Sequence, residues 1–297
     1  MRDALRTALT VNLAATAGLF LCVLLPCWLL GAPFKFVALF ALGDFAVGLL
    51  GSAVFSAFPG LVITNAAMAR QATGRNGHEK WLLSNVRKLS ATAKIQPPAC
   101  YIYSGDEINA LAMGSEGNHA IAITALALEA LDNDSARGLL AIQIGRIASG
   151  TAGSCSAAAG AMMARTLYTA GPAKAPKNIL DVLWMLNPLR IALAGAATVV
   201  AATGYESEKQ ADAFAVKVAG PETVWEALAM LATVEGDTDA ATPKAFALCG
   251  TRTVGYGHRS YRERAHDIFS DEDAPMFVEA LADIPEDPDK PEAENPA

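Results

Sequence analysis

The sequence lacks paired cysteines and is poor in histidine. Its 297 residues include five cysteines and four histidines, and no two cysteines lie at Cys-x-x-Cys spacing. A disulfide framework and a cysteine-based zinc site are therefore not indicated, and a reducing environment fits the polar part of the chain best. His78, His119 and His266 also have no partner at metal-ligand spacing, so none of them predicts a metal site.

Charged residues are scarce as well. They make up 18% of the sequence, against 53% hydrophobic residues, whereas a soluble domain usually carries about 25% charged residues. The net charge of −7 comes from the segment 271–297, which has ten acidic residues and one lysine. The rest of the chain is nearly neutral, which argues against a nucleic-acid partner. Residues 283–297 are rich in proline and acid, and we expect them to be disordered.

Two apolar runs near the N-terminus predict a transmembrane hairpin over residues 1–60. The runs are Leu9–Ala32 and Phe36–Phe58, and each has about the twenty residues that cross the hydrocarbon core of a membrane. Asp44 in the second run is costly in lipid. We therefore expect its side chain to face protein or water.

The charges that flank the hairpin predict its orientation. Residues 61–100 contain six basic residues and one acidic residue, Arg2 and Arg6 mark the other end, and the tip offers only Lys35. Basic flanks favour the cytoplasmic side of a membrane. We therefore expect a multi-pass protein of the inner (cytoplasmic) membrane of a prokaryote-like cell, with its soluble domain in the cytoplasm.

The remainder of the chain, residues 61–282, predicts a mostly helical α+β domain with a small β-sheet. The short strands alternate with turn residues, and the longer helices have apolar residues at helical spacing. The main predicted elements are strands at Cys100–Tyr103, Ile108–Met113 and His119–Thr124 and helices at Glu79–Ala93, Ser135–Ala148 and Glu206–Val218.

Two weaker apolar stretches, 151–171 and 179–203, interrupt this domain. The first is rich in alanine and glycine and carries Arg165, and the second contains Asp181 and Pro188. Neither has the composition of a clean membrane span. Both are either weak membrane segments or amphipathic helices at the membrane surface, and hydropathy leaves that choice open.

Several short segments of the domain carry motifs in a fixed order. They are Tyr101–Tyr103 with Asn109–Gly114, Ala120–Leu131, Leu139–Gly150, Glu208–Asp212 and, more weakly, His258 with Glu263 and Arg264. Together they resemble the HtpX-like membrane zinc metallopeptidases, which are of the gluzincin type. The resemblance implies a transmembrane hairpin followed by a zincin-like metallopeptidase domain. It also implies proteolysis in membrane protein quality control, with zinc as the cofactor of intact relatives.

The metal-binding motif of that family is not intact in this chain. Where the family has His-Glu-x-x-His, the sequence has Ile142-Gln143-Ile144-Gly145-Arg146. Histidines at i and i+4 bind zinc from one helix face, and the glutamate activates the metal-bound water. Ile142 has no donor atom, Gln143 cannot act as a general base, and Arg146 would repel a metal ion. We therefore expect no cofactor and a pseudoprotease, catalytically inactive.

Other parts of the implied site are retained. The resemblance places Glu208 at the third zinc-ligand position, Asp212 where a carboxylate steadies a ligand, and His258 near the substrate carbonyl. Alternatively, the two carboxylates form a solvent-exposed pair on a polar helix, and His258 is a turn residue without a task. We hypothesise that Arg146 reaches Glu208 or Asp212 and replaces the metal with a salt bridge.

Three functions are compatible with these residues. The favoured one is a non-catalytic binding or regulatory module that holds extended peptides or membrane-protein segments. The alternatives are an active zinc-dependent endopeptidase that degrades membrane proteins, and a domain that braces an oligomer. Peptide capture requires backbone groups at a sheet edge, and we expect this edge to be the strand formed by Ala120, Ile121, Ala122, Ile123 and Thr124.

Overall fold

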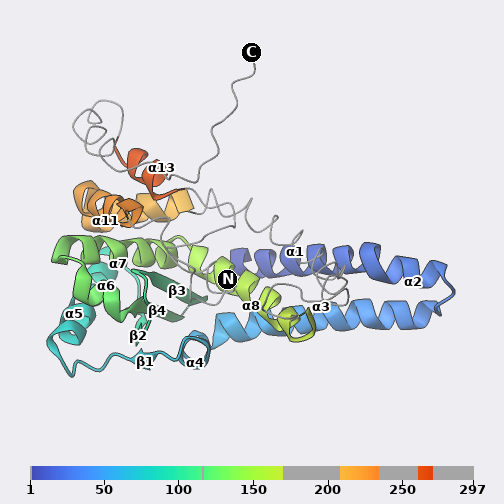
Figure 1. Cartoon of the computed structure of the whole chain (residues 1–297). Coiled ribbons are helices and arrows are strands. Elements are labelled where there is room, and N and C mark those ends of the chain that lie inside the picture. Colours follow the sequence, from blue (N-terminus) through green and yellow to red (C-terminus); the bar gives the residue numbers. More distant parts are fainter. Residues whose placement is uncertain (1, 116, 170–207, 234–259, 270–297) are drawn as a thin grey trace, which may run out of the picture.

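The computed structural model describes residues 2–115, 117–169, 208–233 and 260–269. Figure 1 shows a long helical hairpin that extends from one side of a mixed domain, in which a small sheet lies beneath the helix α7. The predictions for 179–203, His258 and 283–297 lie outside the described residues.

The described elements confirm the α+β, mostly helical fold that the sequence predicts. The N-terminal helices are α1 (Arg2–Leu19), the π-helix η1 (Phe20–Leu24), α2 (Leu25–Leu29), α3 (Phe34–Ala57) and α4 (Pro59–Ala66). The helices of the domain are α5 (Gly77–Ala93), α6 (Ala125–Ala130), α7 (Asn133–Ala148), α8 (Thr151–Thr169), a helix over residues 208–219, α11 (Pro221–Thr233) and α13 (Tyr261–His266). The strands are β1 (Arg70–Gln71), β2 (Ala99–Tyr103), β3 (Ala110–Ser115) and β4 (Asn118–Thr124).

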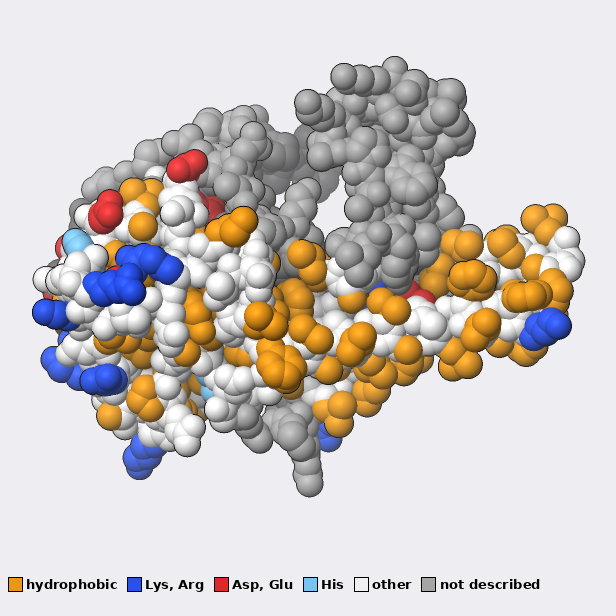
Figure 2. Space-filling view, turned by 90° about the horizontal axis from the view of Figure 1, so that it is seen from below, with side chains coloured by type: hydrophobic (Ala, Val, Ile, Leu, Met, Phe, Trp, Pro, Cys, Tyr) orange, Lys and Arg blue, Asp and Glu red, His pale blue; other side chains and the backbone are white. Residues whose placement is uncertain are grey.

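The N-terminal residues form a helical hairpin, and the crossing of a membrane by both of its arms stays a prediction. One arm consists of α1, η1 and α2, and the other arm is α3, which starts after Pro33. Among the described residues, α3 is the one helix long and apolar enough to cross a membrane. Leu39, Phe40 and Leu50 on this helix are each about two-thirds exposed. Figure 2 shows apolar side chains of this kind along the hairpin.

Asp44 of α3 turns inward, as expected for a carboxylate in an apolar run. It is only 8% exposed, and it forms an ion pair with Arg165 of α8. α8 packs against both α1 and α3, and Figure 1 shows it beside the hairpin. The described part of the first weaker apolar stretch, residues 151–169, therefore folds as a helix that packs against the hairpin.

The sheet has the order β1-β2-β4-β3, which corrects the prediction of a peptide-binding edge. Ala120–Thr124 belongs to β4, which pairs in parallel with β2 on one side and antiparallel with β3 on the other. Its backbone groups on both sides are therefore engaged in the sheet. The prediction was wrong because the β3–β4 hairpin is visible in the sequence, whereas the insertion of β4 between β2 and β3 is not. The outer strand next to β4 is β3.

The helix α7 is the centre of the domain. Nearly all of its residues from Ser135 to Ile147 are buried, because sheet strands and other helices pack around it. Two glycines allow its closest contacts. A Cβ atom on Gly138 would lie 2.1 Å from the carbonyl oxygen of Thr223, and one on Gly145 would lie 2.2 Å from that of Ala211. Both distances are too short for a side chain, so α7 and its neighbours touch backbone to backbone.

The Gly145 contact predicts a large effect of a single added methyl group. We expect Gly145→Ala to lower the free energy of unfolding by about 3 kcal/mol, the upper end of the range for overpacking a tight core, because the opposing atoms belong to backbone. Chemical unfolding of the detergent-solubilised protein measures this change. The control is Gly77→Ala, since a Cβ atom there meets nothing within 4 Å. Equal stability of both variants would contradict the packing described here.

Candidate functional site

The three substituted motif positions lie inside the protein on α7. Asp132 caps this helix by accepting hydrogen bonds from two backbone N–H groups at 2.9 and 2.8 Å. The helix then carries Ile142, Gln143 and Arg146 into the interior, where they are 1%, 0% and 3% exposed. A buried amide and a buried guanidinium are tolerated only where protein groups surround them with polar partners. This part of α7 therefore lies inside the protein, and the polar ends of Gln143 and Arg146 must be satisfied there by protein groups.

The helix 208–219 brings both retained carboxylates to this place. It crosses α7 where Ala211 meets Gly145, one residue before Arg146. Glu208 and Asp212 lie one turn apart on this helix and are 3% and 6% exposed. The alternative interpretation, a solvent-exposed pair, is therefore wrong. The crossing places the two carboxylates beside the residues that replace the metal-binding motif.

Asp212 has a partner that differs from the one hypothesised. The Nε and Nη2 atoms of Arg264 donate to its two carboxylate oxygens at 2.9 and 2.7 Å. Arg264 comes from α13, whose first turn is fixed by a capping box between Ser260 and Glu263. Paired parallel bonds of this kind are the strongest geometry for an arginine and a carboxylate. Asp212 is therefore paired with Arg264, and not with Arg146.

Arg264 remains charged at this buried position. Burial alone would lower the pKa of its guanidinium, but the carboxylates of Asp212 and Glu208 outweigh burial and raise that pKa above its usual value. The same electrostatic interaction shows that Glu208 lies within the field of Arg264. One cation therefore acts on both carboxylates of the helix 208–219.

Arg146 points towards a third helix. Its guanidinium lies close enough to the thiol of Cys155 on α8 to act on it electrostatically, and so does the carboxylate of Glu208. Arg146, Cys155 and Glu208 thus form one neighbourhood made by α7, α8 and the helix 208–219. The hypothesised salt bridge between Arg146 and Glu208 fits this neighbourhood and stays a prediction.

The residues at this site do not suit a zinc ion. Ile142 offers no donor atom, and Arg146 brings a positive charge to a former ligand position. Asp212 is already engaged on both oxygens. In the part of the chain that the structure describes, no group of three histidine, cysteine, aspartate or glutamate side chains is arranged to hold a metal. Gln143 also cannot take up a proton from water.

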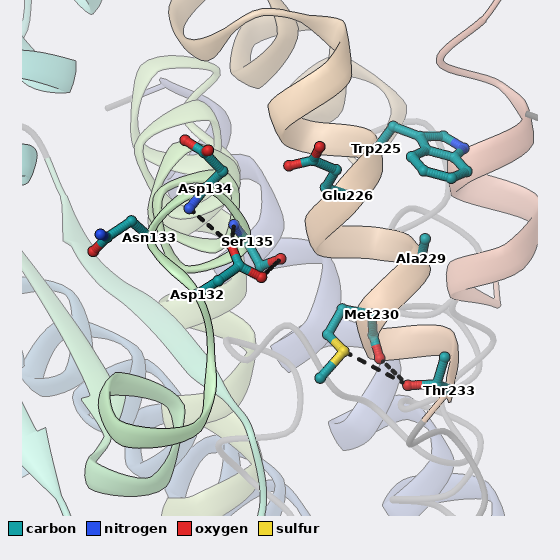
Figure 3. A pocket seen from close by; sticks show the side chains of 9 residues that line it. All are labelled: Asp132, Asn133, Asp134, Ser135, Trp225, Glu226, Ala229, Met230 and Thr233. Atoms are coloured by element: carbon teal, nitrogen blue, oxygen red, sulfur yellow. Dashed lines mark hydrogen bonds between the residues drawn. The ribbon is translucent and has the colours of Figure 1, made fainter.

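A separate cavity lies at the other end of α7. It has a volume of about 710 Å³ and opens between the first turn of α7 and α11, and Figure 3 shows its lining. Asp132 in its wall is already used to cap α7. About ten residues, or roughly 15 Å of helix, separate this cavity from Gln143. It is therefore distinct from the substituted motif.

Two residues of the site were not identified from the sequence as partners. Arg264 was noted in the sequence as part of a weak C-terminal motif. Its positive charge, which could neutralise a retained carboxylate, was the signal that would have paired it with Asp212. Cys155 had no such signal, because its approach to Arg146 depends on how α8 packs. His258, expected near the substrate carbonyl, lies outside the described residues.

Comparison with known proteins yields a family and partial relatives. The model of peptidase family M48 matches residues 76–269, a range that contains the whole site. Protease HtpX of Xanthomonas oryzae pv. oryzae is 35% identical over 114 residues, and Protease HtpX of Xylella fastidiosa is 34% identical over 114 residues. Each match covers 35% of this chain and 39% of the relative. The chain thus spans about two fifths of the length of these curated relatives.

The Arg264–Asp212 pair yields a prediction for stability. Arg264→Gln leaves a buried carboxylate without its cation, so we expect a loss of about 3–5 kcal/mol. Arg264→Lys keeps the positive charge but not the paired hydrogen bonds, so it should lower the free energy of unfolding by less. Chemical unfolding measures both. Arg87→Gln, which removes an exposed arginine of α5, is the control and should change little. A neutral effect of Arg264→Gln would show that the pair does not hold α13 in place.

Proposed function

Because the chain belongs to peptidase family M48, we propose that it is a membrane-anchored member of the family that binds polypeptide segments without cleaving them. The observation that carries this proposal is the burial of Ile142, Gln143 and Arg146 at the crossing of α7 with the carboxylate-bearing helix 208–219. A catalytic metal centre of the His-Glu-x-x-His type needs its ligands and base at these positions.

The chemistry at these positions favours binding over hydrolysis. Zinc-dependent peptide cleavage needs a metal-activated water and a group that takes its proton. Gln143 has the shape of the glutamate that acts as the general base, but its amide does not accept a proton. Arg146 and Arg264 supply two cations against the carboxylates of Glu208 and Asp212, so the buried charges balance without a metal. We propose a salt bridge between Arg146 and Glu208 as part of this balance.

The likeness to the HtpX proteases suggests the class of partner. We propose that the protein holds extended segments of membrane proteins, as a binding or regulatory module in membrane protein quality control. The sheet has two outer strands, β1 and β3, and β3 packs beside α7 and α8. A bound segment is not expected along Ala120–Thr124, because both sides of that strand are already paired in the sheet.

The membrane anchor in this proposal is the N-terminal hairpin. Its support is the length and apolarity of α3, the exposed leucine and phenylalanine side chains along it, and the inward position of Asp44. Exposed basic residues, among them Arg75, Lys80 and Arg87, follow the hairpin in the chain. They favour a cytoplasmic domain in the inner membrane.

Restoring the motif tests the loss of the metal site. We expect the triple variant Ile142→His, Gln143→Glu and Arg146→His to bind about one zinc per chain, because the helix frame and Glu208 remain. Isothermal titration of the purified protein with zinc measures it. The matched control replaces the same three residues with alanine and should bind none. A folded restored variant that takes up no zinc would mean that these positions do not form the former site.

Site-directed labelling tests the orientation. Leu30 at the hairpin tip is 88% exposed, and Lys94 at the end of α5 is exposed in the domain. In a background without other reactive thiols, we expect an impermeant maleimide added to intact cells to modify Leu30→Cys but not Lys94→Cys. In inverted membrane vesicles the pattern should reverse. Labelling of both residues from one side would rule out a hairpin that crosses the membrane.

A further inference from the structure

A buried network of charged and polar groups joins α8 to the hairpin. Arg165 of α8 donates from Nε and Nη2 to the two carboxylate oxygens of Asp44 in α3, at 3.0 and 2.8 Å. Its Nη1 donates to the side-chain oxygen of Asn12 in α1 at 2.7 Å. Thr16 of α1 donates to Asp44 at 2.5 Å. One ion pair thus connects three helices, and its two members are 2% and 8% exposed.

The packing around the ion pair is built to accommodate it. A Cβ atom on Gly48 would lie 1.8 Å from the Asn12 oxygen and 2.3 Å from the Arg165 Nη1, so a side chain there would have to displace these two groups. Gly51 of α3 and Gly160 of α8 meet backbone to backbone, because a Cβ atom on either would lie 2.2 Å from the carbonyl oxygen of the other. Close contact of this kind fixes the rotation and the axial position of α8 against α3.

The same helix forms a wall of the substituted metal site. At its first turns, Ser156 accepts a hydrogen bond from the backbone N–H of Gly114 in β3 at 2.9 Å, and the Cys155 thiol lies within the electrostatic influence of Arg146. Ten residues separate Cys155 from Arg165, which is about 15 Å of helix. A rigid helix of this length transmits a shift or rotation at one end to the other.

We propose that Asp44 and Arg165 are positioning residues for the site, which act on it through α8. Their ion pair holds α8 at one depth and one rotation against the hairpin. This placement holds Cys155 against Arg146 and Ser156 against the outer strand β3. The inference goes beyond the proposed function, and it does not depend on whether the site binds polypeptide or metal.

The ion pair has an energetic property that makes the proposal testable. Removing one member leaves a lone charge in apolar surroundings, which is expensive. Removing both charges leaves two neutral amides that can still bond to each other. Asp44→Asn and Arg165→Gln should therefore each disturb α8 more than the double variant does.

Hydrogen–deuterium exchange of the full chain in detergent, followed by mass spectrometry, reads out the wall of the site directly. We expect each single variant to speed exchange in the segments 110–115 and 151–157 at least about tenfold, an effect within the usual coupling range of contacting residues. The double variant should lie closer to the wild type than either single variant. Exchange in α5, which does not touch α8 closely, should stay unchanged in all three.

Two further variants keep the test decisive. Lys35→Gln removes a charge from the hairpin tip and should leave both segments as in the wild type. Arg165→Lys keeps the positive charge but not the two parallel hydrogen bonds to Asp44, so it should give an intermediate rise in the exchange rate. This variant takes the place of Arg165→Gln if Arg165→Gln does not fold. Single variants that exchange like the wild type would overturn the proposal. So would a double variant whose effect is the product of the single effects, or faster exchange in α5 to the same degree.

Discussion

The backbone contact between Gly145 and Ala211 is the constraint on which the site depends. Two helices that touch without side chains between them have one relative position, so the residues that flank the contact are fixed as well. On α7 these are Gln143 and Arg146, and on the helix 208–219 they are Glu208 and Asp212. The contact requires a glycine at position 145, inside the segment that no longer carries metal ligands. The proposed loss of the metal ligands therefore leaves the crossing of the two helices in place.

Charge balance explains how such a frame can persist without a metal. Two carboxylates buried together repel each other and are costly in a protein interior. Arg264 binds Asp212 through two hydrogen bonds, and its charge also acts on Glu208. Arg146 adds a second cation from α7, close to Cys155 of α8. In a metal centre, a divalent cation neutralises such carboxylates. Here the guanidinium groups of Arg146 and Arg264 lie where they can neutralise Glu208 and Asp212.

Much of this arrangement was predictable from the sequence. The inward position of Asp44 followed from the cost of a carboxylate in an apolar run, and α7 followed from its periodicity and its capping aspartate. The burial of Glu208 and Asp212 followed from the family resemblance. Three tertiary features could not be predicted from the sequence. They are the place of β4 inside the sheet, the pairing of Arg264 with Asp212, and the approach of Cys155 to Arg146. Each depends on which surfaces meet, and residue spacing does not encode that choice.

We propose that a set of balanced charges stands in this protein where intact relatives hold a catalytic metal. Elemental analysis of the wild-type protein, purified from its membrane without chelators, tests this claim most directly. We expect far less than one zinc per chain and no cleavage of casein. One tightly held zinc per chain, whose removal by a chelator abolishes cleavage and whose return restores it, would mean that the metal site is intact.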